Sequence, residues 1–119
     1  MAYEAPVEPE MGDVLRRRWQ QVDPDVALGD FLACDRFDRM GDLSAIRTPA
    51  LVVCGAADRL APPKFSHYLA ERIPGALLTI VPGAGHMVML EEPYVVSQAV
   101  AGFLSGLKGS EDWRPPATQ

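Results

Sequence analysis

The chain has 119 residues, of which 48% are hydrophobic, and a formal net charge of −5 at pH 7. This length favours one domain, and the apolar content is ordinary for a globular protein. The acidic balance argues against nucleic acid as a partner, because nucleic-acid binding needs a basic surface.

Both ends of the chain lack hydrophobic periodicity, so we expect disordered tails at residues 1–10 and 109–119 around a folded part. The N-terminus lacks the basic and apolar regions of a signal peptide. No apolar stretch approaches the ~20 residues that a membrane span needs. These features predict a cytoplasmic protein with no membrane partner.

Two helical segments are expected in the first third of the chain. Apolar residues at helical spacing mark one helix from Met11. Asp23 before Pro24 marks the start of a second helix, because an aspartate cap followed by proline is a typical helix beginning. The basic run at 16–18 fits a solvated helix face better than a binding patch. A connector follows from residue 35 to residue 49.

From residue 50 the chain reads strand, helix, strand, helix. The apolar runs at 50–54 and 77–81 show no alternation, which is typical of parallel strands covered on both faces. A helix from Pro62 to about Ile73 would join them, and a last helix begins near Pro93. The predicted fold class is therefore α/β with two parallel strands. The edge of the first strand would stay open, which invites self-association.

A polar residue follows each of these strands. Asp58 comes after the first strand and His86 after the second, at the carboxyl ends where functional loops gather. A histidine exchanges protons at neutral pH, and a carboxylate on its other ring nitrogen fixes its tautomer. Gly55, Gly83 and Gly85 permit sharp turns and leave room beside these two residues. Alone, each residue fits a turn or a surface loop, but together they predict a catalytic acid and base.

The other chemistry-bearing residues have simpler interpretations. We expect His67 to be exposed in mid-helix, and Glu91-Glu92 to cap the last helix and complement its dipole. Cys54 fits a small buried residue, and nothing in the spacing supports a disulfide with Cys34. No cofactor motif is present. A metal site on the acid and the histidine falls short of the three or four ligands that zinc uses.

Two segments resemble the α/β-hydrolase fold family. Residues 46–63 look like the segment of its seventh strand. Residues 73–93, with the Pro-Gly-Ala-Gly-His sequence that ends at His86, look like its eighth strand, histidine loop and closing helix. Residues 31–38 resemble, more weakly, the end of its cap region. The resemblance therefore implies a cap segment at 11–40 and a C-terminal strand–helix–strand–helix unit at 41–108.

This resemblance implies a catalytic triad in which Asp58 is the acid and His86 is the base. The family carries its nucleophile on an earlier strand-to-helix elbow. The 119 residues contain no Gly-x-Ser-x-Gly, and none of the serines lies in such a context. We expect the C-terminal portion of an α/β hydrolase that acts on a small organic ester or related acyl compound. The isolated chain should be inactive, because the acid and base have nothing to activate.

Two alternatives stay open at this point. In one alternative the nucleophile is an aspartate, and the enzyme opens epoxides or removes halides. Family members with an aspartate and those with a serine look alike over the segments that correspond to residues 50–93. A function of a different class is a non-catalytic interaction module, or pseudoenzyme fragment, that pairs through the open strand edge. The size of the protein in solution discriminates the module from the hydrolase portion. A portion of an enzyme should be oligomeric or aggregated when alone, whereas an independent module should be a monomer that unfolds cooperatively.

Overall fold

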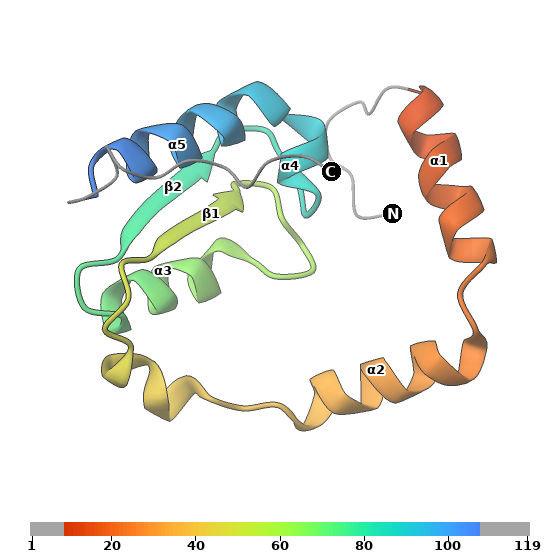
Figure 1. The fold of residues 1–119 in the computed structure, drawn as a ribbon, viewed down its shortest axis with the longest axis horizontal. Helices are drawn as coiled ribbons and strands as arrows, with labels where there is room; N and C mark the ends of the chain where they lie inside the picture. Colours follow the sequence, from red (N-terminus) through yellow and green to blue (C-terminus); the bar gives the residue numbers. More distant parts are fainter. Residues whose placement is uncertain (1–8, 108–119) are drawn as a thin grey trace, which may run out of the picture.

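The computed structural model describes residues 9–107, which form an α/β unit and a helical arm (Figure 1). The expected tails lie outside the described residues, except that Pro9 and Glu10 begin the first helix. In chain order the elements are α1 (Pro9–Gln20), α2 (Pro24–Arg36), the 3-10 helix η1 (Met40–Ala45), β1 (Leu51–Gly55), α3 (Pro63–Arg72), β2 (Leu77–Val81), α4 (Val88–Glu91) and α5 (Pro93–Ser105).

Strands β1 and β2 form one parallel sheet, which confirms the predicted α/β class. They pair in register along their whole lengths, from Leu51 opposite Leu77 to Gly55 opposite Val81. Strand β2 covers the predicted residues 77–81, and β1 lies one residue later than the predicted 50–54. Because the register has no offset, both strands end at the same level of the sheet.

Proline, aspartate and glycine set the helix ends. The Asp23 carboxylate caps α2 by accepting the amide hydrogen of Asp25 over 2.8 Å, and Pro24 is the first helical residue, as predicted. Pro63 is likewise the first residue of α3, although no side chain caps that helix. Gly75 has a φ of +73°, a conformation that favours glycine, and it turns the chain from α3 into β2. Local sequence signals, Pro63 at the start of α3 and Gly75 after its end, therefore set the bounds of the helix that connects the two parallel strands.

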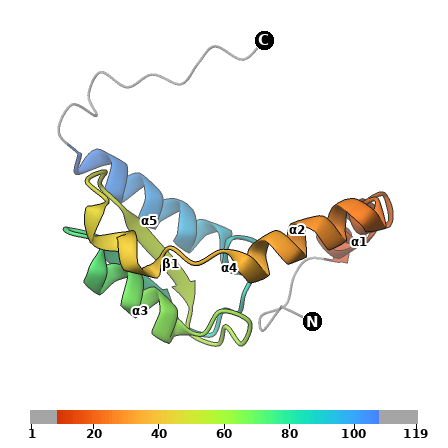
Figure 2. The same cartoon turned by 90° about the horizontal axis from the view of Figure 1, so that it is seen from below.

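The core of the α/β unit lies between the sheet and its covering helices. Val81, Ala84 and Val88 are buried together, and Val53 and Val96 pack against them. Helices α3 and α5 cover opposite faces of the sheet (Figures 1 and 2). This small core supports the ends of the strands rather than their beginnings, so it lies directly beneath the loops that follow β1 and β2.

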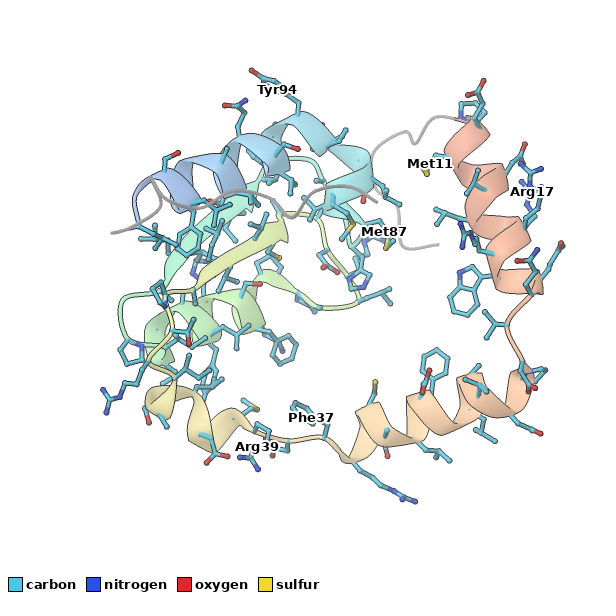
Figure 3. All side chains as sticks on the ribbon, in the orientation of Figure 1. Met11, Arg17, Phe37, Arg39, Met87 and Tyr94 are labelled. Atoms are coloured by element: carbon cyan, nitrogen blue, oxygen red, sulfur yellow. The ribbon has the colours of Figure 1, made fainter. Side chains whose placement is uncertain are left out.

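The arm formed by α1 and α2 buries none of its residues. Trp19 is 64% exposed and Phe31 is 65% exposed. Phe37, after α2, and Tyr94, on α5, also project from the ribbon (Figure 3). Exposed apolar surface on this scale is unusual for a protein that works as a monomer. Among the described residues, no helix is both long enough and apolar enough to cross a bilayer.

We expect the 119-residue chain to self-associate in solution. The described part of the sheet has only two strands, so both of its edges are free to pair, and the arm adds exposed aromatic side chains. Size-exclusion chromatography with light scattering should detect species larger than the monomer. Replacing both Trp19 and Phe31 with serine should shift the distribution toward the monomer. A monodisperse wild-type monomer that unfolds cooperatively would contradict this expectation.

Candidate active site

The loops after β1 and β2 leave the sheet side by side. Beyond the strands, the amides of Ala56 and Ala57 donate to the carbonyls of Val81 and Ala84, each over 2.9 Å. These bonds continue the pairing of the sheet into the loops that carry the acid and the histidine. The convergence predicted from the two strand ends is therefore confirmed, whereas the catalytic role of the pair stays a prediction.

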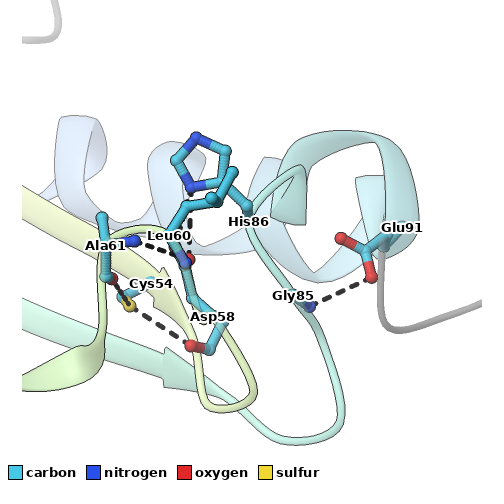
Figure 4. Close-up of polar contacts among 8 residues, drawn as sticks. Cys54, Asp58, Leu60, Ala61, Gly85, His86 and Glu91 are labelled. Carbon is cyan, nitrogen blue, oxygen red and sulfur yellow. Dashed lines mark hydrogen bonds and ion pairs between the residues drawn. The ribbon is translucent and has the colours of Figure 1, made fainter. Parts of the chain in front are cut away.

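Asp58 and His86 are in direct contact (Figure 4). His86 Nδ1 lies 3.0 Å from Asp58 Oδ2 and 3.2 Å from Oδ1. Asp58 is only 8% exposed, and its Oδ1 also accepts the amide hydrogens of Leu60 and Ala61, each over 2.9 Å. The carboxylate is thus held by its own loop before it meets the imidazole. The His86 side chain is 39% exposed and remains open to solvent on one side.

The surroundings of Asp58 determine its charge. Burial raises the pKa of this carboxyl, but hydrogen bonds from the Ala61 amide, the His86 ring and the Leu60 amide outweigh burial. The pKa of Asp58 therefore lies below its ordinary value of 3.8. An ionised carboxylate only accepts hydrogen bonds, so a neutral His86 must carry its proton on Nδ1. This tautomer leaves Nε2 as a proton acceptor.

Gly55 is required for the close approach of the two loops. It is buried, and a Cβ at this position would collide with the carbonyl oxygens of Ala84 and Gly85. The sequence predicted that Gly55 and Gly85 turn the chain sharply and leave room beside the acid and the histidine. Within residues 9–107 only Gly75 and Gly83 have a positive φ, so the room is the part of the Gly55 prediction that the structure confirms. At Gly55 the constraint is space, because any larger residue would push the histidine loop away from the acid loop.

Sequence reasoning missed the role of Glu91, and its capping prediction for this residue is wrong. Glu91 ends the four-residue helix α4 and is 8% exposed. Its Oε1 accepts the amide hydrogen of Gly85 over 3.0 Å (Figure 4). Glu92 occupies the N-cap position of α5, but its side chain makes no capping hydrogen bond. The unpredicted α4 turns Glu91 back toward the histidine loop and away from the start of α5.

The remaining candidates lie apart from this pair. His67 is exposed on α3, as predicted. Cys34 is exposed and Cys54 is buried, and both are free thiols. All three arginines of the basic run at 16–18 are exposed on α1, and Arg16 pairs with Asp13 over 2.7 Å. In the part of the chain that the structure describes, no group of three His, Cys, Asp or Glu side chains could hold a metal ion.

Comparisons with known proteins place these features in context. A profile of the alpha/beta hydrolase family matches residues 2–99. RutD from Caulobacter sp., which is named as a putative carbamate hydrolase, is 43% identical over 83 residues, or 70% of this chain and 31% of RutD. The chain thus spans about a third of the length of this curated relative.

Solved structures give the same picture. A thermophilic esterase superposes with a TM-score of 0.74 at 34% identity, covering 87% of this chain and 42% of the esterase. The enol-lactonase from Burkholderia xenovorans LB400 superposes with a TM-score of 0.57 at 31% identity, covering 60% of this chain and 27% of the lactonase. In each case a part of a larger hydrolase matches most of this chain.

We expect Gly55→Ala to lower the free energy of unfolding by about 1–3 kcal/mol, because the new methyl group overpacks against backbone that cannot move aside. Denaturant unfolding monitored by circular dichroism would measure the change. Gly102→Ala, in the middle of α5 where a Cβ would meet open space, is the matched control and should not destabilise the protein. Equal stability of the two variants would refute the steric role of Gly55.

The ionisation of Asp58 should make stability depend on acid pH. Because its pKa is lower in the folded chain than its ordinary value of 3.8, its stabilising effect is present above that value. The effect is lost as the pH falls through the folded pKa. Unfolding measured across a pH series should therefore show Asp58→Asn to be less stable than wild type near neutrality. The gap should shrink below pH 3.8, and a gap that stays constant into acid would contradict the shift.

Proposed function

Because the chain belongs to the alpha/beta hydrolase family, we propose that it supplies the acid and the base of a nucleophile–histidine–acid triad. The observation that carries this proposal is the 3.0 Å contact between His86 Nδ1 and Asp58 Oδ2, at the carboxyl ends of two adjacent parallel strands. In this proposal the chain is the C-terminal portion of the enzyme. The arm at α1 and α2 is the end of its cap region, and the cytoplasmic location stays a prediction.

The contact assigns a separate role to each side chain. The Asp58 carboxylate accepts a hydrogen bond from His86 Nδ1–H. It also stabilises the imidazolium that forms when His86 accepts a second proton. His86 Nε2 takes the proton of the attacking nucleophile and then returns it to the leaving group. The partial exposure of His86 supports this role, because the base must reach a group outside the described loops.

We propose a small organic ester or a related acyl compound as the substrate. Three of the matched proteins are named as a putative carbamate hydrolase, an esterase and an enol-lactonase, and carbamates, esters and lactones all contain an acyl carbon. Acyl transfer needs a nucleophile beside the base. The 119 residues contain no Gly-x-Ser-x-Gly elbow, so the proposal places the nucleophile outside this sequence and expects no turnover from these residues alone.

The exposed arm and the free edge of β1 favour one further function, that of an interaction module which pairs through this edge with a second copy or another protein. In such a module Asp58 and His86 would serve no catalytic purpose. Substituting either residue would leave association unchanged. The hydrolase proposal instead ties both residues to turnover, so their variants separate the two functions.

A chimera tests the hydrolase proposal directly. We expect Caulobacter RutD to hydrolyse its substrate when the matching third of its chain is replaced by this sequence, since the two are 43% identical there. His86→Ala and Asp58→Asn should each lower kcat in the chimera by at least about a thousandfold. His67→Ala is the matched control and should retain activity, because His67 is exposed on α3.

The isolated chain provides the complementary measurement. It should hydrolyse short-chain p-nitrophenyl esters no faster than its His86→Ala variant. Turnover by the isolated chain that depends on His86 would refute the external nucleophile. A chimera that is folded and active but indifferent to both His86→Ala and Asp58→Asn would refute the triad itself.

A further inference from the structure

We propose that Glu91 is a positioning residue that fixes the backbone of the histidine loop and thereby aims His86 at Asp58. The inference rests on the proposed role of His86 as the base. Glu91 is buried, and its Oε1 accepts the amide hydrogen of Gly85, the residue immediately before His86. A shift of the Gly85 peptide would therefore rotate the His86 side chain directly.

The histidine loop is held from two sides. On one side, the Ala57 amide donates to the Ala84 carbonyl and ties the loop to the acid loop. On the other side, Glu91 accepts from the Gly85 amide over 3.0 Å. Gly85 is buried, so its amide needs an acceptor within the protein, and Glu91 Oε1 supplies it. The Ala84 carbonyl and the Gly85 amide belong to one peptide group, so this peptide is held at both of its polar atoms.

Helix α4 connects this support to the core. Val88 is the first residue of α4, and it is buried against Val81 and Ala84. The amide of Glu91 donates to the Met87 carbonyl over 3.0 Å, which closes the single turn of the helix. The His86 peptide therefore lies between two anchors, the Gly85–Glu91 hydrogen bond on one side and the packed Val88 on the other. Loss of the first anchor would leave His86 free to turn away from the acid.

The position of the proton on His86 tests this inference without any enzymatic activity. We would record the ring nitrogen chemical shifts of the ¹⁵N-labelled 119-residue chain at a pH where both histidines are neutral. In the wild type, His86 should carry its proton on Nδ1, because that nitrogen faces the Asp58 carboxylate. The exposed His67 provides an internal reference for an imidazole without such a partner.

The variants separate a hydrogen-bond acceptor from a charge. Glu91→Ala should lose the Nδ1–H preference of His86 until its ring shifts match those of His67, and exchange of the Gly85 amide should accelerate at least tenfold. Glu91→Gln, whose side-chain carbonyl can still accept the Gly85 amide, should keep both properties of the wild type. Glu92→Ala is the matched neighbouring control and should also behave as wild type, since Glu92 makes no side-chain capping bond.

Each outcome has a distinct meaning. An unchanged His86 tautomer together with a protected Gly85 amide in Glu91→Ala would overturn the inference, and so would a Glu91→Gln variant that behaves like Glu91→Ala. If Glu91→Ala fails to fold, Glu91→Asp, which is one methylene shorter, gives the same comparison with Glu91→Gln. A wild type in which His86 lacks the Nδ1–H form would instead refute the acid–histidine pair on which the proposed function depends.

Discussion

The contact between the Asp58 carboxylate and the His86 imidazole depends on the parallel pairing of β1 and β2 without an offset. Residues so far apart in sequence meet because both strands end at the same level and both loops continue their hydrogen bonding beyond the sheet. A shift of one residue would reverse the faces of every side chain in a strand and would move the loops apart. The register of two five-residue strands is therefore the constraint from which the site follows.

The site is built from backbone contacts more than from side-chain packing. Asp58 is fixed by two amides of its own loop, and the histidine loop is fixed by Ala57 and by Glu91. Gly55 permits this arrangement because it brings no Cβ between the loops. Each of these contacts lies within a few residues of the strand ends. The geometry of the pair is consequently local, although its two members are distant in sequence.

Sequence patterns predicted those parts of the structure that follow from short-range rules. The apolar runs indicated both strands, and the Asp23–Pro24 pair indicated the start of α2. These patterns could not predict that Glu91 contacts the histidine loop. An acidic residue shortly before a helix-starting proline gives the same local pattern whether it caps the helix or turns back to a loop. The distinction depends on α4, a single turn too short to leave a hydrophobic period.

The two halves of the described chain differ in what stabilises them. The α/β unit buries Val81, Ala84 and Val88 beneath its loops, whereas no residue of α1 or α2 is buried. A two-stranded sheet with so small a core has little hydrophobic stabilisation, so additional strands or covering surface would contribute most of it. The acid–histidine pair does not need that contribution for its geometry, since hydrogen bonds around the strand ends already define it. Covering the arm and the sheet edge would therefore raise the stability of the folded unit more than it would change the geometry of the acid–histidine pair.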